Sequence, residues 1–106
     1  GMHLLIKEVH TDAASAKDIL FALRQDFSPF VGVLAHREAD KCGLTILLDD
    51  ALAAQNQWSA AQWIREVAPL IQGGGGGQAG FATAGGKNPA GLGDALQALQ
   101  TKLRGE

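Results

Sequence analysis

The sequence predicts an α/β fold: a mixed four- to five-stranded sheet that contains an antiparallel hairpin and carries about three helices packed on it. Three segments repeat apolar residues at the spacing of a helix face, and short apolar runs of strand length lie between them. A chain of 106 residues has the length of one domain, so residues 1–106 are expected to form a single core.

The first strand is expected over residues 4–9, and Thr11 or Asp12 can cap the helix that follows. This helix should end by Ser28-Pro29, because a residue before proline disfavours the helical conformation. Its apolar face consists of Ala16, Ile19, Leu20, Leu23 and Phe27.

A second strand is predicted over residues 30–36 and a third over residues 44–48. The polar residues 37–43 between them, which include Ala39-Asp40-Lys41, are too few for a parallel crossover, so the two strands should form an antiparallel hairpin. The second strand has apolar residues on both sides, which is typical of a central strand: Val31, Val33 and Ala35 on one side, Phe30 and Leu34 on the other.

Residues 49–57 could be a loop or a short helical turn. Ser59 and Gln62 then form a capping box for a second helix, in which Pro69 should cause a kink or an early end. Residues 81–83 suit a short strand, and Asn88 and Pro89 suit the start of a third helix. The apolar faces are Ala60, Trp63, Ile64, Val67 and Ile71 in the second helix and Leu92, Ala95, Leu96, Leu99 and Leu103 in the third.

The composition excludes several classes of protein. With 46% apolar and 19% charged residues, the chain is expected to fold, and it has no apolar run long enough to span a membrane. One cysteine, Cys42, excludes an internal disulfide, and the three histidines lack metal-ligand spacing. A net charge of −2 argues against nucleic-acid binding over the whole surface but permits a local basic site. We expect a cytoplasmic protein without a signal peptide, and Gly1 is expected to be a cloning remnant.

Two glycine groups carry most of the functional information. The first is followed by Gln78, and the second lies seven residues after the first; the glycines are Gly73, Gly74, Gly75, Gly76 and Gly77, then Gly85 and Gly86. A flexible linker is one interpretation. We favour a shaped backbone surface, because the third helix after the glycines has an apolar face that must dock on the core. Glycines with positive φ can turn successive N–H groups toward one anion.

Gly85, Gly86, Lys87 and Asn88 lie between a strand and a helix start. The unpaired N–H groups of the first helical turn, together with Lys87, are expected to form a binding site for phosphate or carboxylate. A P-loop is excluded, because Asn88 follows Lys87 where that motif needs Ser or Thr. A Rossmann fingerprint is excluded as well, because its glycines follow a first strand, whereas the five glycines here follow a helix.

Other residues have simpler interpretations. His36 and Arg37 end a central strand, and a solvated strand end is favoured over an RNA contact. Trp63 belongs to the core, and Trp58 could pack as a hydrophobic staple. Adjacent Asp49 and Asp50 suit a solvated turn better than a catalytic pair, because neighbouring strand residues point to opposite faces. Cys42 is expected to be inert. Lys102 and Arg104 suit the end of the last helix and could extend a basic edge.

The segment from Gly73 to Gln78, together with Phe81-Ala82-Thr83-Ala84-Gly85-Gly86-Lys87-Asn88-Pro89, resembles the DHH-associated family. This family occurs at the C-terminus of bacterial alanyl-tRNA synthetases and in DHH-type phosphoesterases. The synthetase pattern has arginine or glutamine and then proline after the glycines, whereas Ala79 follows Gln78 here. The phosphoesterase branch places histidine where Gln78 stands.

The resemblance implies a non-catalytic domain that binds tRNA(Ala) and supports aminoacylation and editing by upstream domains. It implies no cofactor in this domain, since ATP and zinc would bind upstream. Together with the glycine groups and Lys87, it leads us to expect RNA contact at Gly73–Gly77, Gln78, Gly85, Gly86, Lys87 and Asn88. A homodimer of the parent enzyme is a further possible partner. Two alternatives stay open: the substrate domain of a phosphoesterase that acts on nucleotides or oligonucleotides, and a dimerisation module.

Overall fold

The computed structural model describes residues 3–27, 29–38 and 41–104. The expectations on Gly1, on Ser28 and on Ala39-Asp40 in the hairpin turn lie outside these residues. In chain order the elements are β1 (His3–Val9), α1 (Ala13–Asp26), β2 (Phe30–Glu38), β3 (Lys41–Leu48), α2 (Asp50–Asn56), α3 (Ala60–Val67), the 3₁₀ turn η1 (Ala68–Ile71), β4 (Gly73–Gly77), β5 (Phe81–Gly86), the 3₁₀ turn η2 (Pro89–Gly91) and α4 (Leu92–Arg104).

The strands form one mixed five-stranded sheet in the order β1-β2-β3-β5-β4. β1 and β2 are parallel and are connected by α1, and every other neighbouring pair is antiparallel. The predicted fold class and the hairpin of β2 and β3 are therefore confirmed.

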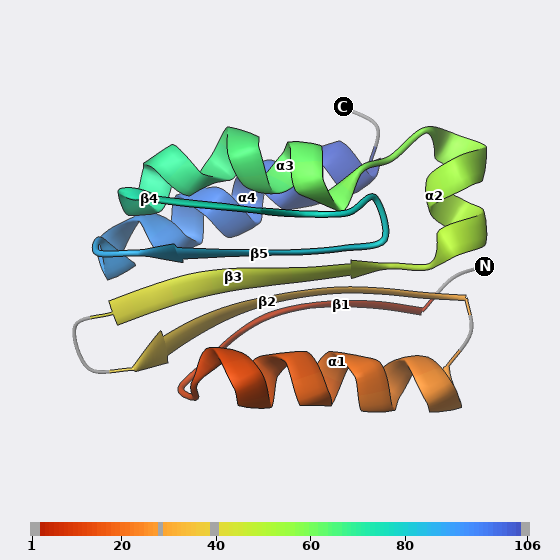
Figure 1. Cartoon of the computed structure of the whole chain (residues 1–106), viewed down its shortest axis with the longest axis horizontal. Helices are drawn as coiled ribbons and strands as arrows, with labels where there is room; N and C mark the ends of the chain where they lie inside the picture. Colours follow the sequence, from red (N-terminus) through yellow and green to blue (C-terminus); the bar gives the residue numbers. More distant parts are fainter. Residues whose placement is uncertain (1–2, 28, 39–40, 105–106) are drawn as a thin grey trace.

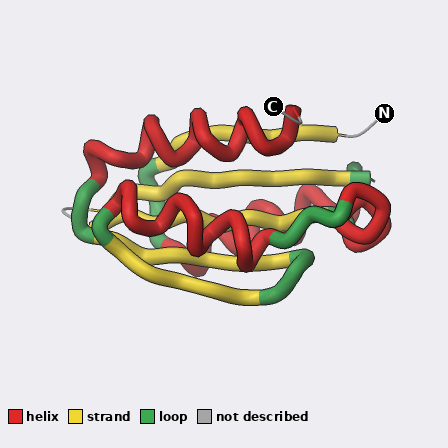
Figure 2. Tube along the Cα trace, turned by 90° about the horizontal axis from the view of Figure 1, so that it is seen from above, coloured by secondary structure: helices red, strands yellow, loops and turns green. Residues whose placement is uncertain are grey.

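Helices cover both faces of the sheet: α1 lies on one face, and α3 and α4 lie on the other (Figure 1). α3 and α4 run side by side over the strands, as the second view shows (Figure 2). Each face has its own core. The larger cluster includes Val31, Val33 and Ala35 of β2, whereas Phe30 and Leu34 belong to the smaller cluster against α1. The predicted two-sided burial of this central strand is thus correct.

Polar side chains begin the helices as the sequence indicated. The Asp12 carboxylate accepts a 2.7 Å hydrogen bond from the Ser15 amide, and Ser59 Oγ accepts one of 3.3 Å from the Gln62 amide. Asp49 caps α2, which occupies most of the stretch that the sequence pattern left open. α3 ends at Val67 and passes into η1, which contains Pro69, so the expected early end is confirmed.

Two local features were not predicted from the sequence. The pentaglycine forms the edge strand β4, although glycine has little intrinsic preference for strands. Asn88 precedes Pro89 as expected, but its side chain does not cap a helix. It donates to the Leu70 carbonyl at 3.3 Å instead, and α4 begins only at Leu92, after η2.

In the part of the chain described, no helix has both the length and the apolar character needed to cross a bilayer.

Candidate functional site

The pentaglycine pairs along its whole length with β5, from Gly73 opposite Gly86 to Gly77 opposite Ala82. A Cβ added to Gly75 would lie 2.1 Å from the Thr83 carbonyl oxygen, and one added to Gly73 would lie 1.8 Å from that of Gly85. These glycines are therefore required for close approach of two backbones. The expectation that successive N–H groups converge on one point is wrong, because neighbouring N–H groups of an extended strand point in opposite directions.

Strand pairing also separates the ten predicted contact residues. Gly73 and Gly74 lie beside Gly85 and Gly86 at the sheet end where Lys87 and Asn88 follow. Gly77 and Gln78 lie at the opposite end, at the turn between β4 and β5. The structure thus brings together six of the ten residues as one group: Gly73, Gly74, Gly85, Gly86, Lys87 and Asn88.

Several of the main-chain donors expected to face an anion are already used. The amides of Lys87 and Asn88 both donate to the Ile71 carbonyl at 3.0 Å, and the Gln78 amide donates to Phe81 at 2.7 Å. Along an antiparallel strand, every second amide donates to the partner strand. The bond from the Gln78 amide to the Phe81 carbonyl shows which amides of β4 do so. The amides of Gly73, Gly75 and Gly77 consequently face the open edge of the sheet.

A second feature of this sheet end was not found from the sequence. His36, Gly43, Gly85 and Gly74 stand opposite one another in a single row across β2, β3, β5 and β4. A Cβ on Gly43 would lie only 2.3 Å from Cε1 of His36, so the imidazole ring covers Gly43. At Gly74, Gly76 and Gly85 an added Cβ would meet nothing within 4 Å. We call these three residues the glycine floor.

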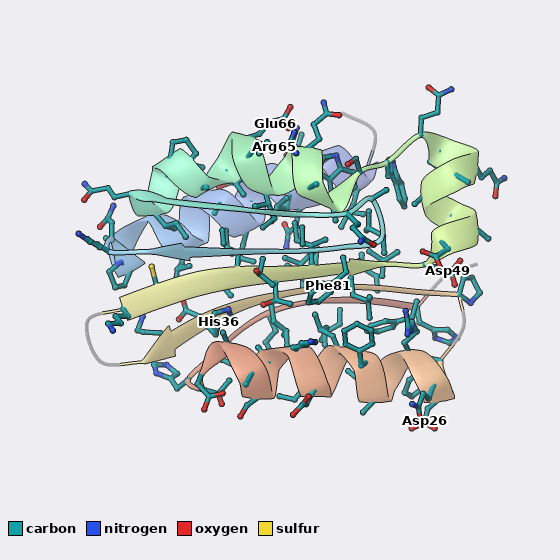
Figure 3. The ribbon with its side chains drawn as sticks, viewed as in Figure 1. Asp26, His36, Asp49, Arg65, Glu66 and Phe81 are labelled. Atoms are coloured by element: carbon teal, nitrogen blue, oxygen red, sulfur yellow. The ribbon has the colours of Figure 1, made fainter. Side chains whose placement is uncertain are left out.

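A cavity of about 300 Å³ lies beside this row. Thr11, the cap residue Asp12 and Ala13, where α1 begins, line one part of it, and His36, Lys41 and Gly85 contribute to the rest. Figure 3 shows His36 near the end of β2 where α1 begins. The pairing of His36 with Gly43 depends on the register of the hairpin between β2 and β3. A prediction of that register is the signal that could have indicated the cavity.

His36 is buried, with 6% of its surface exposed, so the favoured prediction of a solvated strand end is wrong for this residue. Its Nε2 atom lies 3.2 Å from the hydroxyl oxygen of Thr45, which is also buried. Burial lowers the pKa of the His36 imidazole, and the Asp12 carboxylate opposes this shift. The ring is therefore neutral at neutral pH.

Three cationic residues lie at the same sheet end, because Arg37 pairs with Cys42, Lys41 precedes Cys42, and Lys87 follows the partner of Cys42 in β5. Lys41 and Lys87 are exposed. Arg37 is more constrained: its guanidinium donates to the Pro89 carbonyl at 3.3 Å and lies 3.7 Å from a Glu8 oxygen. Its buried Nε atom has no hydrogen-bond partner among the described residues.

The carboxylates have structural roles. Asp49 accepts hydrogen bonds from the amides of Ala51 and Leu52 at 3.0 and 3.3 Å. Hydrogen bonds from the backbone and side chain of Ser15 lower the pKa of Asp12, which keeps the cap ionised. Among residues 3–27, 29–38 and 41–104, no cluster of His, Cys, Asp and Glu could hold a metal ion.

Trp63 is a core residue, as predicted. Trp58 precedes the cap of α3 and packs on Trp63 with ring centroids 5.5 Å apart, which is the arrangement of a hydrophobic staple. Cys42 is buried, and burial raises the pKa of its thiol although Asn88 and Arg37 oppose this. Lys102 pairs with Glu66 of α3, and its hydrogen bond lowers the pKa of Glu66. Its charge is thus offset, and the Arg104 side chain lies outside the described atoms.

Comparison with known families identifies the domain. The DHHA1 domain family matches residues 1–105 of the chain. The chain belongs to the DHHA1 domain family.

Relatives of this DHHA1 domain include alanine–tRNA ligases from two bacteria. The chain is 38% identical over 104 residues to the enzyme of Christiangramia forsetii and 41% identical over 104 residues to that of Porphyromonas gingivalis. These matches cover 98% and 96% of the chain but only 12% of each relative. The chain therefore spans about one eighth of the length of these two relatives.

A solved structure supports the same placement. The C-Ala domain from Aquifex aeolicus alanyl-tRNA synthetase superposes with a TM-score of 0.73 at 31% identity. The match covers 92% of this DHHA1 domain and 85% of that chain. The chain thus matches the C-terminal C-Ala domain of alanyl-tRNA synthetase in both sequence and fold.

Proposed function

We propose that residues 1–106 are a single non-catalytic domain that binds tRNA(Ala) within a cytoplasmic alanine–tRNA ligase. The domain supports aminoacylation and editing by upstream domains of the same chain. ATP and zinc bind in those upstream domains, and this domain takes no cofactor. The match to a C-Ala domain is the observation that carries the proposal, because it covers nearly the whole chain.

The sheet end that holds Lys41 and Lys87 is the proposed RNA-facing surface. Two exposed ammonium groups stand there beside the glycine floor, where no side chain prevents close approach. Lysine contributes to RNA affinity mainly through phosphate, so binding at this end should depend on salt. Gly73, Gly75 and Gly77 add outward-facing amides along the neighbouring edge. Gln78 lies at the far end of that edge and is the last residue of the proposed RNA-binding surface.

Filter binding of the domain to a tRNA(Ala) transcript at low and moderate salt tests the proposal. We expect Lys87→Ala and Lys41→Ala each to weaken binding and to reduce the salt slope by about one unit per lost phosphate contact. Lys7→Ala is the matched control, since Lys7 is an exposed lysine on β1, the strand farthest from β4 in the sheet. Undetectable binding at low salt would overturn the proposal.

The same preparation separates the alternatives. A phosphoesterase substrate domain would bind short oligonucleotides as well as the folded tRNA, whereas a tRNA-binding domain prefers the folded tRNA. Sedimentation of the domain over a range of concentrations tests the dimerisation module. A monomer that still binds tRNA supports the proposed function.

A further inference from the structure

The cavity beside His36 reaches the glycine floor at Gly85, which lines it, and Gly74 and Gly76 continue the bare backbone in the neighbouring strand β4. Gly85 and Gly74 are neighbours in one row, and Gly76 stands opposite Thr83 two residues along, in the next row on the same face. By strand alternation these residues face the same side as Leu34 and Leu47, which pack under α1. α1 packs over β2 and β3 and leaves the glycine floor uncovered.

A flat floor without Cβ atoms selects a flat ligand. The peptide planes of neighbouring strands offer a surface on which an aromatic ring can lie with little gap, and any side chain there would lift the ring away. The cavity volume of about 300 Å³ falls at the lower end of the range of small-molecule sites, roughly 300–1,000 Å³. One planar heterocycle fits such a space better than a folded peptide or a lipid chain.

The polar groups around the floor match the edge of a nucleobase. Nε2 of His36 is engaged with Thr45, so Nδ1 is the ring nitrogen left for a ligand. The Thr83 residue lines the cavity and brings a hydroxyl group. Lys41, on the same cavity wall, can reach a phosphate attached to the ligand. A donor, an acceptor and a cation around a planar floor are the features that recognise a nucleotide.

We propose that this cavity binds one unstacked nucleobase of the RNA, which lies on the glycine floor with its edge toward His36 and its phosphate near Lys41. The inference rests on the proposed function and adds a specific subsite to it. Asp12, which caps α1 beside the cavity, carries a negative charge. It holds phosphate away from the α1 terminus and directs it toward Lys41.

Nuclear magnetic resonance of the labelled domain tests the subsite with the four nucleoside 5′-monophosphates AMP, GMP, CMP and UMP as probes. At least one of them should shift the His36 Cε1–H and the Thr83 and Gly85 amide signals in a saturable manner. Ribose 5-phosphate is the matched probe that has the phosphate without the base, and it should leave the His36 signal unchanged.

Gly85→Leu fills the floor without altering charge, and its Cβ has open space. It should weaken binding of the active monophosphate on the order of ten-fold, the scale of one lost base-stacking contact. Gly93→Leu adds the same side chain at another open glycine, on α4, and should leave binding unchanged. Gly74→Leu fills the floor from β4 and replaces Gly85→Leu if that variant does not fold.

The outcomes separate the two proposals. If tRNA binds but none of the four monophosphates shifts the His36 signal, the nucleobase subsite is wrong and the tRNA role stands. Equal shifts with ribose 5-phosphate would also overturn it, because they would mark a site for phosphate alone. Saturable base-dependent shifts that Gly85→Leu removes, in a domain that binds tRNA, support it.

Discussion

The Nε2 atom of His36 and the Oγ1 atom of Thr45 lie 3.2 Å apart in the sheet face that α1 covers. They are the two buried polar residues found in the described part of the chain. A buried polar group left without its partner destabilises a protein more than an exposed one does. The pair therefore links the stability of the sheet to the geometry of the cavity.

Thr45→Val should lower the free energy of unfolding by about 1–3 kcal/mol, because His36 Nε2 then loses its partner in a buried setting. Valine has nearly the shape of threonine, so little packing is lost. Urea denaturation followed by circular dichroism measures the change. Thr101→Val is the control: its hydroxyl bonds the Gln97 carbonyl on the surface of α4, and the change should stay within about 0.5 kcal/mol. Equal losses in both variants would contradict the role assigned to Thr45.

The stability of the domain should fall as the pH drops below about 6.5, where an ordinary histidine becomes protonated. Burial lowers the pKa of His36 in the folded state, so the unfolded chain binds more protons in this range. Stability consequently rises with pH through this window and is fully present above it.

Thermal unfolding at pH 7.5 and pH 5.5 measures this effect. His36→Gln should show a smaller difference between the two melting temperatures than the parent domain. His10→Gln, at an exposed histidine, should retain the full difference. A parent-like pH dependence in His36→Gln would show that another group is responsible.

Gly75→Ala should destabilise the domain by about 1–3 kcal/mol, because the new methyl group would lie 2.1 Å from the Thr83 carbonyl oxygen. Gly74→Ala, one residue earlier in the same strand, meets nothing within 4 Å and should be neutral or slightly stabilising. Urea denaturation of both variants makes the comparison. Similar stabilities would mean that β4 does not pair closely with β5.

The Cys42 thiol should react slowly with a disulfide reagent in the folded domain at pH 8. It is buried, and burial raises the pKa of its thiol, so little reactive thiolate is present. As the chain has one cysteine, the absorbance change reports this residue alone. Reaction in urea should reach the rate of an unprotected thiol, and an equally fast reaction without urea would contradict the prediction.

The sequence predicted the elements that have a local signal. Asp12, Ser59 and Pro69 act on their own neighbours through caps and a missing amide, so their effects can be read one segment at a time. The strand formed by the five glycines has no such signal. It exists because β5 provides its partners, and no property of Gly75 taken alone indicates that pairing.

The candidate site was predicted only in part for a related reason. Lys87 lies between a strand and a helical turn as expected, but its amide donates to the Ile71 carbonyl, and this contact joins residues from two separate segments. The row from His36 to Gly74 likewise depends on three strand registers together. Such features arise from tertiary pairing, which single-segment patterns do not contain.

The turn between β4 and β5 also accepts hydrogen bonds from the first backbone amides of α3. The amides of Ala60 and Ala61 donate to the carbonyls of Ala79 and Gln78 at 2.9 and 3.1 Å. The first turn of α3 lies beside the Trp58–Trp63 pair, and the chain has two tryptophans. The domain thus carries a built-in optical reporter: indole emission will respond when the glycine hairpin loosens or tightens, with no dye attached.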